Sequence, residues 1–170
     1  MSQHGALENL VVLDLTRVLA GPFCTMMLAD MGAKVIKIEM PVSGDDTRAY
    51  PPFRTNCNGE RESLYFANIN RNKQGITLNL KAQQGKEIFK KLVETADIVV
   101  ENYRPGVMDK LGLGYDVLKE INPRIIYGSV SGFGNTGPYR LRPGYDILGQ
   151  AMGGLMAITG SKGGEPTRAG

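Results

Sequence analysis

The residues of this sequence best suited to bind a ligand are four cations at or near the ends of apolar segments: Arg17, Lys81, Arg104 and Lys110. Arg17 belongs to a loop over residues 16–21 that leads into Pro22, and proline is favoured in the first turn of a helix. Backbone N–H groups at the start of a helix form a common binding site for phosphate and other anions. These residues therefore predict binding of an anionic small molecule.

The residue types needed for a metal site or a histidine-assisted nucleophile are nearly absent. His4 is the single histidine, and Cys24 and Cys57 are too far apart for a CxxC pair, so we expect no metal and two free thiols. A nicotinamide site is a weak alternative. The loop before Pro22 holds one glycine where the dinucleotide fingerprint needs three, although Glu39 stands near the ribose-binding position.

The charge of the chain is mild, with a formal net charge of +3 and no block of five basic residues. This distribution disfavours nucleic acid as a partner. No apolar run reaches the roughly 18 residues that span a bilayer, so we expect no membrane association. The N-terminal segment lacks the basic and apolar regions of a secretory signal, and we therefore expect a cytoplasmic protein.

Strand and helix patterns alternate along most of the chain. Short β-branched runs predict strands over residues 10–15, 34–39, 75–80, 97–101 and 124–131. Apolar spacing and turn residues predict helices over residues 22–31, 83–96, 107–111, 116–121 and 145–156. The alternation predicts the α/β class, with a mostly parallel, doubly wound sheet flanked by helices.

Three loops follow predicted strands and are expected at one edge of the sheet: 16–21, 102–106 and 132–137. Ligands of α/β proteins bind at the carboxyl ends of parallel strands, so we expect a crevice there, with the four cations as phosphate partners. Residues 40–62 are polar and rich in Pro, Asn and Gly, and they predict a long surface loop. Residues 159–170 resemble a linker into a further element, so we expect the sequence to be interrupted there.

Several segments in a fixed order resemble the opening of class III CoA-transferases, of the formyl-CoA, oxalate or carnitine type. These segments are 12–22, 32–39, 44–48, 70–73, 96–106, 122–124 and 131–138. The resemblance covers almost the whole chain, from Leu7 to Gly170. It implies that residues 1–170 are the N-terminal part of a Rossmann-like CoA-binding large domain. It also implies a second, small domain outside this chain and an interlocked homodimer as the complete assembly.

The resemblance further implies which residues contact coenzyme A. Leu19 stands where the formyl-CoA transferases have glutamine, which argues against formate and oxalate specificity of that type. Met40 stands where they have arginine, so one phosphate contact either comes from another residue or is absent. The implied contacts are Arg17, Val18, Leu19, Ala20, Met40, Leu78, Asn79, Leu80, Lys81, Asn102, Tyr103, Arg104, Lys110, Arg142, Pro143, Gly144 and Tyr145.

The same resemblance places the nucleophile beyond the sequence. In the family it is an aspartate shortly after a Gly-Xaa-Pro-Xaa-Arg-Xaa-Gly stretch, which here spans residues 164–170. That carboxylate transfers CoA from an acyl-CoA to a free carboxylic acid through an aspartyl-bound intermediate. This chain is therefore expected to bind CoA without turnover, and an inactive CoA-binding or dimerisation fragment is the alternative. An acyl-CoA racemase is disfavoured, since Tyr145 stands where those enzymes carry histidine.

Overall fold

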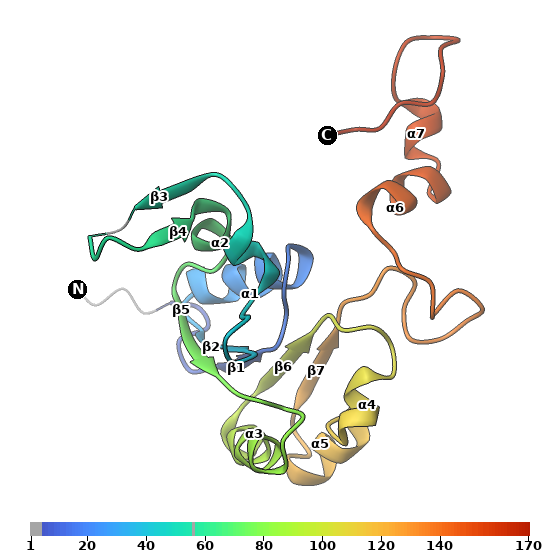
Figure 1. Ribbon diagram of the computed structural model, residues 1–170. Coiled ribbons are helices and arrows are strands. Elements are labelled where there is room, and N and C mark those ends of the chain that lie inside the picture. The colour runs from blue at the N-terminus through green and yellow to red at the C-terminus, as the bar shows by residue number, and fades with distance from the viewer. Residues whose placement is uncertain (1–4, 56) are drawn as a thin grey trace. The chain divides into compact units, whose positions relative to one another are not determined.

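The computed structural model describes residues 5–55 and 57–170, and its main feature is a sheet of five parallel strands formed by residues 11–129. The strands lie side by side in the order β5-β2-β1-β6-β7 (Figure 1). Every neighbouring pair is parallel, which confirms the predicted α/β class. The strands are β1 (Val11–Asp14), β2 (Lys34–Glu39), β5 (Lys73–Thr77), β6 (Ile98–Glu101) and β7 (Ile126–Ser129).

Helices cover both faces of this sheet (Figure 1). On one face, Ala29 of α1 (Ala20–Asp30) packs in a cluster with Val12 of β1. On the other, Phe89 of α3 (Gln83–Thr95) and Leu118 of α5 (Tyr115–Ile121) pack in a cluster with Leu13. Val12 and Leu13 are adjacent, and successive side chains of a strand point to opposite faces, so β1 is buried on both sides. The short helix α4 (Val107–Leu111) follows β6.

Residues 40–62, predicted as a long surface loop, instead form short elements that hold two polar residues inside the protein. They contain a 3₁₀ turn, η1 (Asp46–Ala49), and an antiparallel hairpin of β3 (Phe53–Thr55) and β4 (Arg61–Ser63), followed by α2 (Leu64–Ile69). Asp45 and Thr47 are buried, because the Asp45 carboxylate accepts hydrogen bonds from the N–H and the hydroxyl of Thr47. Most of the described residues of this segment are exposed, as its polarity suggested, and the buried turn at Asp45 and Thr47 is the exception.

Most other predicted elements agree with the structure to within two residues at each end, and two differ by more. The strand predicted over 75–80 ends at Thr77, so Leu78 and Leu80 lie beyond it, and Leu80 reaches the core. The helix predicted over 145–156 is two helices, α6 (Asp146–Met152) and α7 (Leu155–Ile158). The break falls at Gly154, whose φ of 81° is a left-handed conformation that glycine adopts without steric cost.

The described residues fall into two units, and the second begins at Ser131. Within it, Gly132 and Gly144 approach so closely that a Cβ atom on either would lie 2.3 Å from the other's Cα. The Gln150 side chain donates to the Ala169 carbonyl oxygen and accepts from the Ala169 N–H, both at 2.8 Å. Each of these contacts joins two segments within the second unit, although nearly all of its residues are exposed.

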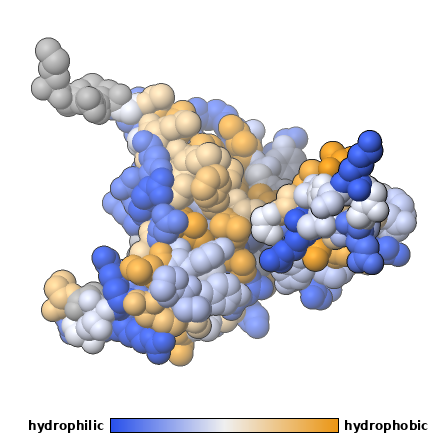
Figure 2. Space-filling view, turned by 90° about the horizontal axis from the view of Figure 1, so that it is seen from above, coloured by the Kyte–Doolittle hydropathy of each residue, from blue (hydrophilic) through white to orange (hydrophobic). Residues whose placement is uncertain are grey.

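Helix α1 carries apolar side chains on its outer side as well as on its inner side. Leu19, Phe23, Met27 and Met31 follow one another at four-residue spacing, and each is between 42% and 53% exposed. Side chains at that spacing share one side of a helix. Apolar surface is visible over the first unit in Figure 2. A helix that is apolar all round is typical of an interior position, so this outer side is suited to contact further protein.

Candidate functional site

The carboxyl ends of the parallel strands bring most of the predicted site residues to one edge of the sheet. Arg17 follows β1, Met40 follows β2, residues 78–81 follow β5, and Asn102 follows β6. In the sheet, the order β5-β2-β1-β6 makes these four segments neighbours. Two of the three loops predicted at this edge, 16–21 and 102–106, lie within the first unit, with the loop after β1 near the middle of the edge, whereas residues 132–137 belong to the second unit.

Two side chains fix the backbone of this first loop. Asp14 Oδ1, at the end of β1, accepts the Thr16 N–H at 2.9 Å and the Thr16 hydroxyl at 2.5 Å. Asn102, just after β6, accepts the Arg17 N–H at 2.9 Å and donates to the Arg17 carbonyl oxygen at 2.7 Å. The predicted ligand residue Asn102 thus has its side-chain amide engaged with the loop itself.

A buried ion pair holds the same loop from the side of β2. Lys37 Nζ lies 3.0 Å from Asp45 Oδ2 and 2.8 Å from the Thr16 carbonyl oxygen, and both charged side chains are almost fully buried. Asp45 Oδ1 accepts the Val18 N–H at 3.2 Å. Val18 has a φ of 70°, a left-handed conformation that is unfavourable for a β-branched residue. The loop is therefore held in a shape that its own sequence does not favour.

A second buried lysine lies beneath the start of α1. Lys73 Nζ donates to Asp14 Oδ2 at 3.0 Å, to the Pro22 carbonyl oxygen at 2.9 Å and to Asn70 Oδ1 at 2.9 Å. The Thr25 hydroxyl donates to the same Asp14 oxygen at 2.7 Å. Burial lowers the pKa of Lys73, and the charge and hydrogen bond of Asp14 oppose that shift. Asp14 thereby joins β1 to both α1 and β5.

Gly21 allows α1 to begin directly against the loop. A Cβ atom at this position would lie 2.4 Å from the Thr16 Cβ, and Thr16 is itself fixed by Asp14. No side chain caps the start of α1 at Leu19. The N–H groups of that first turn are suited to an anionic ligand.

Glu39 ends β2 and organises the turn that carries Asp45. Its carboxylate accepts two hydrogen bonds from Arg48, at 2.8 and 2.7 Å, and one from the Asp45 N–H at 2.8 Å. Burial acts to raise the pKa of Glu39, but the hydrogen bonds from Arg48 and Asp45 and the charges of Arg48 and Lys37 outweigh it and lower the pKa. The Arg48 guanidinium also stacks 3.8 Å from the centre of the Phe66 ring.

The four cations predicted as phosphate partners are all exposed. The Arg17 guanidinium lies 3.7 Å from an Asp46 carboxylate oxygen, with both side chains more than half exposed, so this ion pair is weak. Lys81 follows β5 and Arg104 follows β6, whereas Lys110 lies within α4. Their exposure leaves the positive groups accessible to a ligand.

The other predicted contacts in the first unit divide between surface and core. Leu19 is 48% exposed and Met40 is 47% exposed. Leu80 is buried in the core, and Leu78 and Tyr103 pack against the same core. Burial raises the pKa of Tyr103, and the charge of Arg17 opposes that shift. The two remaining contacts in this unit, Ala20 and Asn79, are exposed.

The predicted contacts at residues 142–145 belong to the second unit. The Arg142 guanidinium lies 4.2 Å from the centre of the Tyr139 ring, and Pro143 is exposed. Gly144 makes the close crossing with Gly132. Tyr145 stands just before α6 and is 75% exposed.

Sequence reasoning missed the buried charges beneath the edge: Asp14, Lys37, Asp45, Lys73 and Glu101. The sequence does indicate two of these buried charges. Asp14 and Lys37 interrupt apolar runs that predict parallel strands, and such strands are buried on both faces. Burial raises the pKa of Glu101, and hydrogen bonds from Ser129, the Tyr103 N–H and Tyr127 oppose that shift.

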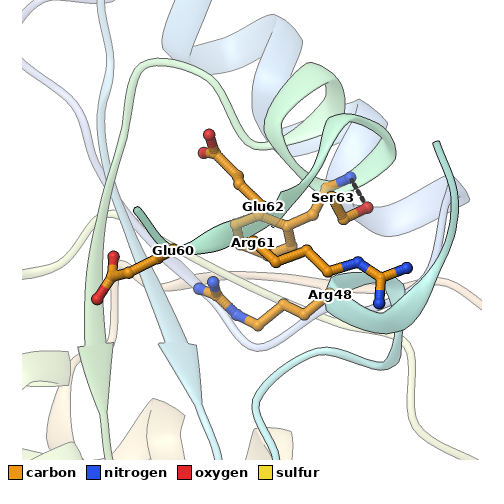
Figure 3. Close-up of a pocket in the computed structure, with 6 residues that line it drawn as sticks. Arg48, Glu60, Arg61, Glu62 and Ser63 are labelled. Carbon is orange, nitrogen blue, oxygen red and sulfur yellow. Dashed lines mark hydrogen bonds between the residues drawn. The ribbon is translucent and has the colours of Figure 1, made fainter. Parts of the chain in front are cut away.

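A hollow of about 330 Å³ lies beside this network. The Arg48 and Arg61 side chains run along it with their guanidinium groups pointing in opposite directions (Figure 3). Glu60 and Glu62 share the lining, together with Ser63 and Phe66. Positive groups that diverge and are balanced by carboxylates are not arranged to hold a phosphate, so the sheet edge remains the candidate site.

Across residues 5–55 and 57–170, no group of three or more His, Cys, Asp or Glu side chains is placed to hold a metal ion. His4 lies outside the described residues. Cys24 and Cys57 are free cysteines. In the described part of the chain, no helix is both long enough and apolar enough to cross a membrane.

Known relatives match nearly the whole chain. The family model for CoA-transferase family III matches residues 7–170. The acetyl-CoA:oxalate CoA-transferase of Acetobacter aceti is 52% identical over 98% of this chain and 41% of its own length. The human succinyl-CoA:glutarate CoA-transferase is 51% identical over 100% of this chain and 38% of its own length. The chain thus spans about two-fifths of the length of these curated relatives.

A solved structure agrees with this match. The crystal structure of a CaiB/BaiF family protein from Brucella suis superposes with a TM-score of 0.93 at 47% sequence identity. The superposition covers 99% of this chain and 44% of that one. The likeness therefore extends over both units of the present chain.

The lowered pKa of Glu39 gives an expectation for acid unfolding. A carboxyl with a lowered folded-state pKa contributes stability above its ordinary pKa of 4.5, and this contribution is lost as the pH falls through the folded value. Glu39→Gln is expected to lower the free energy of unfolding at pH 7 by about 1–3 kcal/mol, because it removes the charge of a buried hydrogen-bonded carboxylate. Between pH 5 and pH 3, the stability of this variant is expected to decrease less than that of the parent. The measurement is the urea concentration at the midpoint of unfolding, taken at each pH.

The matched control is Glu62→Gln, which alters the exposed ion pair with Arg54. This variant is expected to change the free energy of unfolding by less than about 1 kcal/mol, since exposed pairs contribute little. Equal losses in the two variants at pH 7, with parallel decreases on acidification, contradict the role given to Glu39.

Proposed function

The chain belongs to CoA-transferase family III, and we propose that it supplies the coenzyme A site for transfer of CoA between an acyl-CoA and a free carboxylic acid. Relatives include transferases named for oxalate, glutarate and mesaconate. Each of these acids has two carboxylates. A small dicarboxylic acid is therefore the acceptor that we propose for the complete protein.

The observation that carries this proposal is the fixed loop after β1. Its backbone is hydrogen-bonded to side chains at Thr16, Arg17 and Val18, so it has one shape before a ligand arrives. It leads into the uncapped start of α1, and exposed cations follow the neighbouring strands. Coenzyme A carries three phosphate groups, and a fixed loop beside a helix start and several cations is suited to such a ligand.

We propose that the reacting carboxylate is an aspartate shortly after Gly170. One of its oxygens attacks the thioester carbonyl of the acyl-CoA, the C–S bond breaks, and CoA leaves as a thiolate. The thiolate then attacks the aspartyl carbonyl of the mixed anhydride and releases the first carboxylic acid. An incoming carboxylate attacks the aspartyl thioester, the C–S bond breaks, and a second mixed anhydride forms. The released thiolate then attacks the carbonyl of the incoming acid, which forms the new acyl-CoA and restores the aspartate. In this scheme the present residues bind and orient CoA.

We also propose that the complete protein is a cytoplasmic homodimer. The outer side of α1, from Leu19 to Met31, exposes four large apolar side chains at helical spacing. Helices α6 and α7 expose Ile147, Met152 and Ile158 as well. Apolar surface of this extent is typical of a protein contact and favours association in water.

Direct binding of coenzyme A tests the proposed site. Titration calorimetry with the unmodified chain is expected to detect CoA binding. Arg17→Ala and Arg104→Ala are each expected to weaken it by about 10–100-fold, the loss typical of a charge-assisted hydrogen bond. The control is Arg124→Ala, because Arg124 is an exposed cation that precedes β7 at the opposite edge of the sheet. Equal weakening by all three substitutions argues against a localised site.

An assay of CoA transfer separates the transferase from the alternative, an inactive CoA-binding fragment. The 170-residue chain is expected to show no turnover with succinyl-CoA and a dicarboxylic acid, whereas the protein extended to the length of its relatives is expected to be active. Replacing the first aspartate after Gly170 with asparagine is expected to abolish activity and preserve CoA binding. Turnover by the short chain contradicts the position given to the nucleophile. An inactive extended protein that still binds CoA favours the fragment hypothesis.

A further inference from the structure

The backbone around Arg17 is fixed on both sides by one buried ion pair. Lys37 Nζ donates to the Thr16 carbonyl oxygen at 2.8 Å, and Asp45 Oδ1 accepts the Val18 N–H at 3.2 Å. The two charged groups meet each other at 3.0 Å beneath the loop. The residues before and after Arg17 are thus attached to opposite members of the same pair.

The conformation that this pair stabilises is costly for the residue that adopts it. Val18 has a φ of 70°, and a left-handed conformation costs an ordinary residue about 1–2 kcal/mol. A β-branched side chain makes this region still less accessible. Strained residues persist where the surrounding structure holds them, and they concentrate at functional sites.

Stability alone is a weak explanation for such a pair. Lys37 and Asp45 each have side chains no more than 2% exposed, and removing both charges from water is expensive. Apolar residues of similar volume often stabilise a protein equally well or better. A buried pair that also hydrogen-bonds strained backbone has a geometric effect that apolar residues cannot reproduce.

We propose that Lys37 and Asp45 are positioning residues, which hold the backbone of residues 16–18, with Val18 in its left-handed conformation, so that Arg17 and the start of α1 are presented to coenzyme A. Neither side chain reaches the ligand, since both are buried. Their effect on affinity is exerted through the backbone at Thr16 and Val18. The part of this inference that concerns affinity rests on the proposed function, whereas the part that concerns loop conformation does not.

Neighbouring groups hold the Lys37–Asp45 pair in place. Asp45 also accepts from the N–H and the hydroxyl of Thr47, and its own N–H donates to Glu39. Lys37 Nζ lies 5.9 Å from the centre of the Phe66 ring. Asp45 is therefore fixed by the η1 turn, so its Oδ1 is a stationary acceptor for Val18. Loss of this acceptor frees Val18 to return to an ordinary φ.

The test compares hydrogen exchange and CoA affinity in four variants of the 170-residue chain: Asp45→Ala, Val18→Gly, the combination of both, and Val93→Ala as a control. Val93 is fully buried on α3 and takes part in none of the hydrogen bonds to residues 16–18, so its truncation lowers stability while leaving those bonds in place. Amide exchange is measured on the segment 15–20 without ligand, and affinity by calorimetry with coenzyme A. All measurements are made well below each variant's unfolding midpoint.

Asp45→Ala is expected to accelerate exchange in segment 15–20 and to weaken CoA binding, each by about tenfold or more, as for loss of a hydrogen bond to a charged group. Adding Val18→Gly is expected to recover much of both losses, because glycine adopts a positive φ without support. Val93→Ala is expected to lower the unfolding midpoint and leave both quantities at the parent values. Rescue by glycine is the result that a merely structural role for Asp45 does not produce.

Two results overturn the proposal: equal exchange in Asp45→Ala and Val93→Ala, or no recovery when Val18→Gly is added. If Asp45→Ala does not fold, the double substitution Lys37→Met with Asp45→Ala replaces it, since it removes the acceptor of the Val18 N–H and leaves no unpaired charge in the interior. Faster exchange of segment 15–20 in that variant supports the proposal, and parental exchange overturns it. If the unmodified chain binds no CoA, the proposed function fails, while the exchange measurements still decide the role of the pair.

Discussion

The structure of the candidate site depends on the burial of two ammonium groups beneath one edge of the sheet. Lys37 and Lys73 have side chains at most 2% exposed, and a buried ammonium must be paired and hydrogen-bonded to be tolerated. Asp45 and Asp14 supply the two carboxylates. Because each ammonium also donates to a carbonyl oxygen, of Thr16 or Pro22, neutralising the two charges determines how the chain leaves β1 and enters α1.

This arrangement separates the charges into two layers. Below the loop, two lysines are matched by two aspartates, so the interior carries no net charge from these groups. Above it, Arg17, Lys81 and Arg104 are exposed on neighbouring segments of the same edge. A positive outer layer over a neutral, rigid base attracts an anionic ligand without needing to rearrange for it, which reduces the entropic cost of binding.

The sequence was sufficient to predict a mostly parallel α/β sheet and the loops that follow β1 and β6, because β-branched runs and helical spacing report burial on regular elements. It was insufficient where polar residues are buried. Residues 40–62 look like a surface loop by composition, yet Asp45 lies in the interior because Lys37 requires a partner. That requirement joins residues eight positions apart across a turn, and no periodic pattern encodes it. Likewise, the left-handed Val18 could not be inferred, since valine disfavours that conformation.

The same network bears on where the chemistry can take place. Asp14, Glu39 and Asp45 are all engaged with cations, hydroxyls or backbone N–H groups, and Glu101 accepts the Tyr103 N–H. A nucleophilic carboxylate needs an exposed, uncommitted oxygen that can reach a thioester, and these four lack it because each is buried and hydrogen-bonded. Using any of them would also leave a buried cation or donor unpaired. A carboxylate used to hold the binding loop is therefore unavailable for catalysis, which favours a reacting group supplied by a different part of the protein.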